Sequence, residues 1–307
     1  MKLGVTVPTD DLIARDTPSE MDLPDRNDPI NFMLSAGTGS LQVKLRYLGG
    51  ITSSQCVSTQ DLTQLIDESD PDLDPKLFIH PDLHGAVHAF VENTNFFADR
   101  YGTGYGSMEY LGHIGAEGPY RYTDEGKISP SWHYEARALD VAWVGWRGPG
   151  PAAIRHASRP CDGPHEAQSS TTQYRRLVAV EAGLRKWFGT VLNRNWRPPS
   201  HYDHFHVDCG QTVRLDLRRS SSARSHVHFV QSCIDAFTDY RVGVHDGIYG
   251  TKTREGFGIL LADLGMEDLR PQVDVNQYYL FLDYIMMHGF ADQRAGAYRW
   301  EGTWGVI

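Results

Sequence analysis

Apolar and polar positions along this chain follow two rhythms, one typical of strands and one of helices. Residues 41–47 alternate with period 2, which predicts an amphipathic strand that ends before Gly49 and Gly50. The apolar run at 138–144 is short and rich in β-forming residues, so it predicts a buried strand. A further strand is expected to begin at Met108. Strands mixed with helices indicate an α+β fold.

Apolar stripes at helical spacing predict the helices. The first begins at Pro81 and carries its stripe through Val91. The second follows the capping residues 169–172, and its apolar face is expected to continue to Val191. The remaining helices are expected near 227–237, 257–264 and 276–288.

Length, charge and hydropathy narrow the class of protein. The 307 residues are enough for two domains. The net charge of −10, from 29 basic and 39 acidic residues, disfavours a sequence-independent nucleic-acid binder. No run of about 18 apolar residues occurs, so no membrane span is predicted. The N-terminus lacks the apolar core of a signal peptide, which predicts a signal already removed or a non-classical route of delivery.

The four cysteines contain no Cys-x-x-Cys pair, which excludes a structural zinc finger. They are Cys56, Cys161, Cys209 and Cys233. A Cys161–Cys209 disulfide would tether the loop before the second helix to the end of the His-rich stretch. Four buried thiols are the alternative.

Two stretches carry candidate chemistry. The first contains His133 and Asp140, and the second, about sixty residues later, contains His201, His204 and His206. Asp140 falls within a predicted strand, and His133 is expected on a loop that folds back onto it. Because His204 and His206 are two residues apart, a strand would direct both to one face.

Two imidazoles and one carboxylate are a common ligand set for catalytic zinc, which keeps a fourth position for water. Zinc lowers the pKa of its water to roughly 7 and polarises a substrate carbonyl, and peptide hydrolysis needs both effects. A His-x-His pair alone is more often a pair of half-buried, hydrogen-bonded histidines. The combination with His133 and Asp140 favours a metal site.

The context of these residues resembles a known group of zinc enzymes. Ser131-Trp-His133, the run from Ala136 to Asp140 and the later His-bearing strand are similar to the D-alanyl-D-alanine carboxypeptidase and endopeptidase group. Within it, they most resemble the extensin-like C-terminal domain family. The resemblance covers roughly residues 80–210. It departs at Ala136, where the group has glycine, and in lacking a carboxypeptidase-type glutamate before the last His pair.

The resemblance implies three ligands for Zn²⁺: His133, Asp140 and His206. It implies His204 as the base or proton carrier, a role that the unperturbed histidine pKa of about 6.5 allows. His201 resembles a further active-site histidine of the penicillin-insensitive murein endopeptidases, and we expect it to move protons together with His204. Arg121 would stabilise the developing oxyanion or hold a substrate carboxylate, and a surface arginine on a strand is the alternative.

The composition changes after Cys209. Arg214 to Ser225 is basic and Ser-rich and predicts a linker. The following run from Asp246-Gly to Thr253, between two helices, resembles the three-helix peptidoglycan-binding domain family, and a helical bundle without a ligand is the alternative. The expected division is an N-terminal extension with an amphipathic strand, a zinc peptidase domain, a linker and a peptidoglycan-binding-like helical domain, at 1–78, 79–212, 213–225 and 226–307.

The patterns and the two resemblances together predict an α+β zinc peptidase domain with a small antiparallel sheet and flanking helices, plus a C-terminal three-helix bundle. The resemblances imply the activity of a DD-endopeptidase or carboxypeptidase on stem-peptide or cross-link amide bonds of peptidoglycan, in the periplasm or extracellular cell wall. Such an enzyme would be a phage-type lytic enzyme or a secreted toxin effector. An effector would add an immunity protein or a secretion-system carrier as partners. The alternatives are a non-catalytic wall-binding protein that retains a metal site, and a zinc hydrolase for a substrate such as a free dipeptide.

Overall fold

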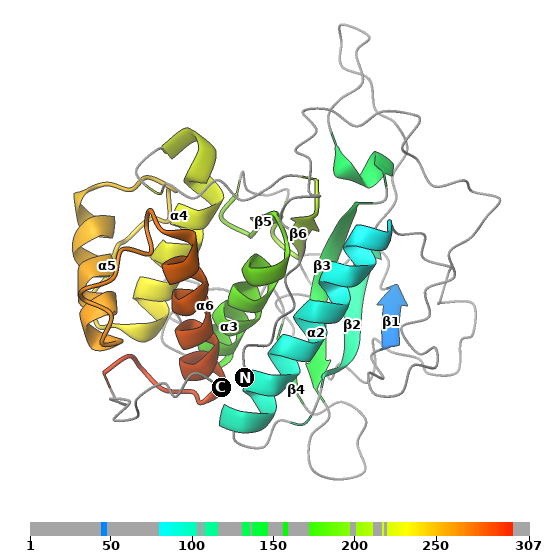
Figure 1. The fold of residues 1–307 in the computed structure, drawn as a ribbon, viewed down its shortest axis with the longest axis horizontal. Helices are drawn as coiled ribbons and strands as arrows, with labels where there is room; N and C mark the ends of the chain where they lie inside the picture. Colours follow the sequence, from blue (N-terminus) through cyan, green and yellow to red (C-terminus); the bar gives the residue numbers. More distant parts are fainter. Residues whose placement is uncertain are drawn as a thin grey trace, which may run out of the picture.

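The computed structural model confirms an α+β architecture for the part of the chain that it describes (Figure 1). That part comprises residues 44–47, 80–102, 106, 108–115, 131–135, 137–146, 156–158, 172–196, 201–210, 217 and 220–296. Its helices are α2 (Pro81–Tyr101), α3 (Thr172–Trp187), α4 (Ser220–Phe237), α5 (Thr251–Asp263) and α6 (Val275–Phe290). A single 3-10 turn, η4, spans Trp132–Glu135 within these ranges.

The strands form one sheet in the order β1-β2-β3-β6-β5, and β4 pairs with β3. They are β1 (Lys44–Tyr47), β2 (Met108–Gly115), β3 (Ala138–Trp146), β4 (His156–Ser158), β5 (Thr190–Leu192) and β6 (Phe205–Asp208). The sheet is antiparallel as predicted, except that the edge strand β1 runs parallel to β2. The chain between β1 and β2 includes α2, and a long crossover of this kind is what a parallel pair requires.

The helices begin where the sequence supplies caps. His80 precedes α2 and its Nδ1 accepts a hydrogen bond from the Asp82 amide, while Pro81 occupies the first turn. Asp274 caps α6 by accepting hydrogen bonds from two backbone amides of its first turn. None of the helices in the described ranges is long and apolar enough to cross a membrane.

The second predicted helix is shorter than its apolar stripe suggested. α3 ends at Trp187, and Val191 lies in β5, opposite Val207 of β6. The Gly189 amide donates to the Asp208 carbonyl oxygen at 2.9 Å, so the chain leaves the helix directly into the sheet. Val191 is buried in β5, and it would also be buried as part of a longer helix. The apolar pattern alone therefore did not distinguish a further helical turn from a short strand.

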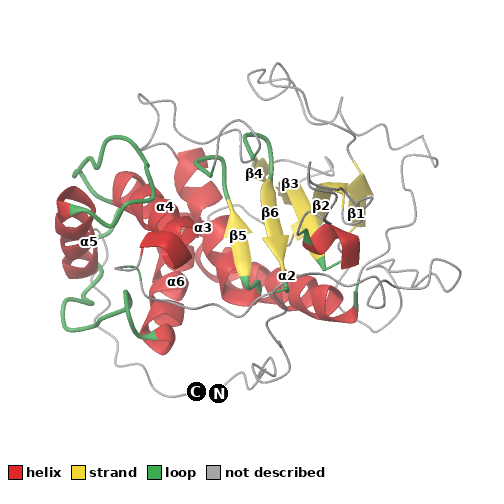
Figure 2. Cartoon of the chain, turned by 90° about the horizontal axis from the view of Figure 1, so that it is seen from above, coloured by secondary structure: helices red, strands yellow, loops and turns green. Residues whose placement is uncertain are grey.

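One hydrophobic core extends from the sheet to the C-terminal helices. Figure 2 shows the strands on one side of the molecule and α4 and α5 on the other, with α3 between them. α6 packs along α3 and also contacts α2. Gly289 permits this approach, because a Cβ there would lie 2.5 Å from the Cβ of Ala179. Trp146 of β3 meets Phe290 of α6 edge to face, with ring centroids 5.4 Å apart.

The predicted self-contained C-terminal bundle is not confirmed. Phe281 of α6 does contact Phe229 of α4 and Phe257 of α5, but α6 shares its longest interface with α3. The predicted linker also overlaps the beginning of α4 at Ser220. The division of the chain at 213–225 therefore stays a prediction.

The predicted Cys161–Cys209 disulfide is not present. The Cys209 thiol is free and buried, as is that of Cys233, which agrees with the alternative of buried thiols for these two. Cys56 and Cys161 lie outside the described residues. Most of the predicted N-terminal extension also lies outside them, and its amphipathic strand corresponds to β1.

Candidate metal centre

Asp140 and His206 are brought together by the sheet. The two residues face one another directly across the antiparallel pair β3 and β6. Residues directly opposite in such a pair project to the same face of the sheet. The predicted strand around Asp140 is therefore what places its carboxylate beside the His-rich stretch.

His133 reaches the same place from η4, which folds back as predicted. The neighbouring Trp132 packs over Gly210, where a Cβ would lie 1.9 Å from the indole ring. The Arg137 amide donates to the Trp132 carbonyl oxygen, and the Cys209 amide donates to the Arg137 carbonyl oxygen, both at 3.0 Å. These contacts fasten the turn to the end of β6 and hold His133 over the sheet.

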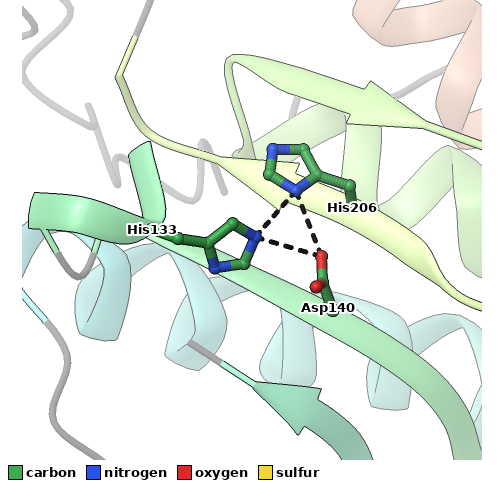
Figure 3. A group of neighbouring side chains, drawn as sticks. All are labelled: His133, Asp140 and His206. Carbon is green, nitrogen blue, oxygen red and sulfur yellow. Dashed lines mark hydrogen bonds and ion pairs between the residues drawn. The ribbon is translucent and has the colours of Figure 1, made fainter. Parts of the chain in front are cut away.

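Figure 3 shows the three side chains pointing toward one another. His206 Nδ1 lies 3.1 Å from Asp140 Oδ1 and 3.1 Å from His133 Nε2, and His133 Nε2 lies 3.3 Å from Asp140 Oδ1. Ligands at bond lengths of about 2.0–2.2 Å around a tetrahedral ion are about 3.3–3.6 Å apart, slightly farther than these atoms are. The donor set of His133, Asp140 and His206 could therefore hold a metal ion.

The two other predicted histidines lie beside this triangle. His204 Nε2 is 3.7 Å from Asp140 Oδ1. The His201 ring is 5.2 Å from that of His204 and 6.0 Å from that of His206, centroid to centroid. His201 sits on the loop before β6, as predicted, with its Nδ1 3.2 Å from the Trp196 carbonyl oxygen. Arg121 lies outside the described residues.

The protonation of the triangle follows from its contacts. Burial opposes the charge of Asp140, but hydrogen bonds from His133 and His206 outweigh it and hold the pKa of Asp140 well below its usual range. Burial also opposes the charge of His206, yet its hydrogen bonds to Asp140 and Asp208 raise its pKa to about 9. The charges of the triangle therefore favour one cation, either a proton on His206 or a metal ion.

His201 and His113 behave differently. Burial and the neighbouring His204 lower the pKa of His201 to about 4, so its ring is neutral at neutral pH. His113 is buried in β2, and burial lowers its pKa to about 4 against the opposing charge of Asp140. It lies opposite Val141 of β3, next to Asp140 in the chain, and is part of the buried packing of the sheet.

Two carboxylates of the site were not predicted. Asp203 Oδ1 lies 2.8 Å from His204 Nδ1, and Asp208 Oδ2 lies 3.4 Å from His206 Nε2. Each carboxylate is within two positions of the histidine that it contacts, and this spacing was the available signal.

Compared with known proteins, the chain matches no family model, no curated protein and no solved structure. The resemblance to the extensin-like C-terminal domain family therefore stays a prediction from its motifs.

Proposed function

We propose that this protein is a zinc-dependent peptidase that cleaves amide bonds in peptidoglycan stem peptides or cross-links. The observation that carries the proposal is the triangle of His133, Asp140 and His206 with two further imidazoles beside it. Two imidazoles and one carboxylate suit zinc, and three protein ligands leave a fourth position for water. Bound zinc would supply the Lewis acidity that activates water and polarises the scissile carbonyl.

His204 is the best placed proton carrier. Asp203 holds its Nδ1, so Nε2 is the nitrogen directed toward the triangle. A proton can move from the attacking water to Nε2 and from there to the departing amine. In this route His204 performs the acid–base step that a glutamate performs in carboxypeptidase-type sites.

His201 would orient the substrate rather than carry the proton. Its Nδ1–H donates to the Trp196 carbonyl oxygen, and a neutral ring then keeps a lone pair on Nε2. That lone pair can accept a hydrogen bond from a substrate N–H or O–H group. Arg121 keeps its proposed role at the oxyanion or at a substrate carboxylate.

The assignment to peptidoglycan is supported by two motifs, the His- and Asp-bearing stretches of the metal centre and the run from Asp246-Gly to Thr253 before α5. In the second motif, Gly247 has a φ of +69°, which glycine adopts without strain, and Asp246 Oδ1 accepts a hydrogen bond from the Ile248 amide. These residues form a tight turn before α5 and leave Ile248 and Val244 exposed beside it. We propose this loop as part of a wall-binding surface, which would raise the effective concentration of enzyme on its polymer.

The proposal is tested by digesting purified sacculi with zinc-loaded protein and identifying soluble fragments by mass spectrometry. We expect shortened stems or separated cross-links from the wild type and none from Asp140→Ala. The masses would also decide between an endopeptidase and a carboxypeptidase. Equal release by the two proteins would refute a reaction at this centre.

A non-catalytic wall-binding protein is the second candidate. It is favoured by one observation, that His133, Asp140 and His206 also satisfy one another by hydrogen bonds and ion pairing alone. Sedimentation of the protein with sacculi, without release of fragments by wild type or variant, would select this alternative.

A further inference from the structure

Each of two imidazoles at the centre has a carboxylate on the ring nitrogen that faces away from the triangle. His206 directs Nδ1 to Asp140 and His133, and its Nε2 lies 3.4 Å from Asp208 Oδ2. His204 has the opposite arrangement, with Nε2 toward Asp140 and Nδ1 2.8 Å from Asp203 Oδ1. The His206–Asp208 pair thus directs Nδ1 toward the triangle, whereas the His204–Asp203 pair directs Nε2 toward it.

Asp208 is fixed more firmly than a surface carboxylate. It is the last residue of β6, paired with Ala138 on one side and Thr190 on the other. Its Oδ1 accepts a hydrogen bond from the Gly210 amide at 3.1 Å, and its side chain is 4% exposed. A carboxylate buried to this extent needs donors, because an unpaired buried charge is costly. The Nε2–H of His206, two residues earlier in β6, is a side-chain donor that faces Asp208 Oδ2.

Asp203 is held less tightly. Its side chain is 23% exposed and lies in the turn before β6, adjacent in sequence to the histidine that it contacts. Its carboxylate nevertheless accepts a shorter hydrogen bond than Asp208 does, so it also fixes which nitrogen of its partner carries the proton.

We propose that Asp208 is a positioning residue that makes His206 offer Nδ1 to a metal ion, and that Asp203 is the positioning residue for His204. The inference rests on the proposed metal centre and assigns separate tasks to the two carboxylates. Asp208 acts through a ligand, so it controls metal affinity. Asp203 acts through the proton carrier, so it controls turnover.

The matched variants Asp208→Asn and Asp203→Asn separate these tasks, because each removes one carboxylate with little change in size. Zinc affinity is measured by competition with a chromophoric chelator, and ligand geometry by the visible spectrum of the Co²⁺-loaded protein. We expect Asp208→Asn to weaken zinc binding by roughly 10–100-fold and to change the Co²⁺ spectrum. Asp203→Asn is expected to keep the wild-type zinc affinity and Co²⁺ spectrum, and to lower kcat on sacculi.

Wild-type zinc affinity in Asp208→Asn, or an equal loss of affinity in the two variants, would overturn the inference. If wild-type protein binds neither Zn²⁺ nor Co²⁺, the proposed metal centre fails and takes this inference with it.

A measurement on the wild type remains decisive even where Asp208→Asn does not fold. In zinc-loaded, ¹⁵N-labelled protein, the imidazole nitrogen shifts show which nitrogen of His206 carries the proton. Protonated Nε2 and metal-bound Nδ1 are expected. The reverse assignment would refute the role of Asp208.

Discussion

His204 differs from the other imidazoles of the centre because it contacts a carboxylate on one side without joining the triangle of possible ligands. We therefore expect His204→Ala to retain zinc affinity while kcat falls by roughly 10²–10⁴-fold, the usual contribution of a general acid–base group. Equilibrium dialysis measures the zinc affinity, and sacculus digestion measures kcat. A loss of zinc from His204→Ala would instead make His204 a ligand.

Buried histidines away from the centre make stability depend on pH. Burial and the charge of Arg185 lower the pKa of His226 to about 3, and burial lowers the pKa of His288 to about 4. The unfolded chain binds these protons near pH 6.5, whereas the folded protein does not. Stability is therefore full above about pH 6.5 and is lost as the pH falls toward the folded pKa values, by up to about 1.4 kcal/mol per pH unit for each group.

Urea unfolding of the metal-free protein at about pH 7.5 and about pH 5 measures this loss. His226→Gln removes one titrating group, so the variant is expected to lose less stability than the wild type between the two pH values. An equal loss in both proteins would show that folding does not lower the pKa of His226.

At the scale of elements, the position of His133 depends on how closely η4 approaches the end of β6. A methyl group at Gly210 would overlap the Trp132 ring, so Gly210→Ala should displace the turn. We expect weaker zinc binding from a protein that remains folded by circular dichroism. Gly258→Ala is the matched control, because a Cβ there meets nothing within 4 Å. Unchanged zinc affinity in Gly210→Ala would mean that η4 is not what places His133.

The elements also show what the sequence could and could not predict. Periodicity predicted that Asp140 lies in a buried strand, and the pairing of β3 with β6 does place it opposite His206. His204 directly precedes β6 rather than lying in it, and its Nε2 is 3.7 Å from the same carboxylate. The predicted end of the helix that became α3 was wrong, because Val191 continues its apolar stripe and also suits a short strand. Asp203 and Asp208 were overlooked because their tasks depend on the ring orientation of a neighbour, which spacing does not specify.

At the scale of the whole molecule, the packing of α6 on α3 joins the C-terminal helices to the sheet. A larger side chain at Gly289 would overlap Ala179 and the Arg175 carbonyl oxygen. We expect Gly289→Val to lower the free energy of unfolding by about 1–3 kcal/mol or more, as overpacking of a core does. Calorimetry should show one transition that moves as a whole. Two transitions, of which only one moves, would instead support the predicted division into separately folding domains.

If this centre hydrolyses peptidoglycan through a bound zinc ion, activity must follow a titration with zinc. Chelator-stripped protein is mixed with purified sacculi, zinc is added in increments, and newly released amino groups are counted. We expect no release without metal, a rise that reaches its plateau at one zinc per chain, and no rise for Asp140→Ala. Release by the stripped protein at the rate of the zinc-loaded one would contradict hydrolysis through a bound zinc ion.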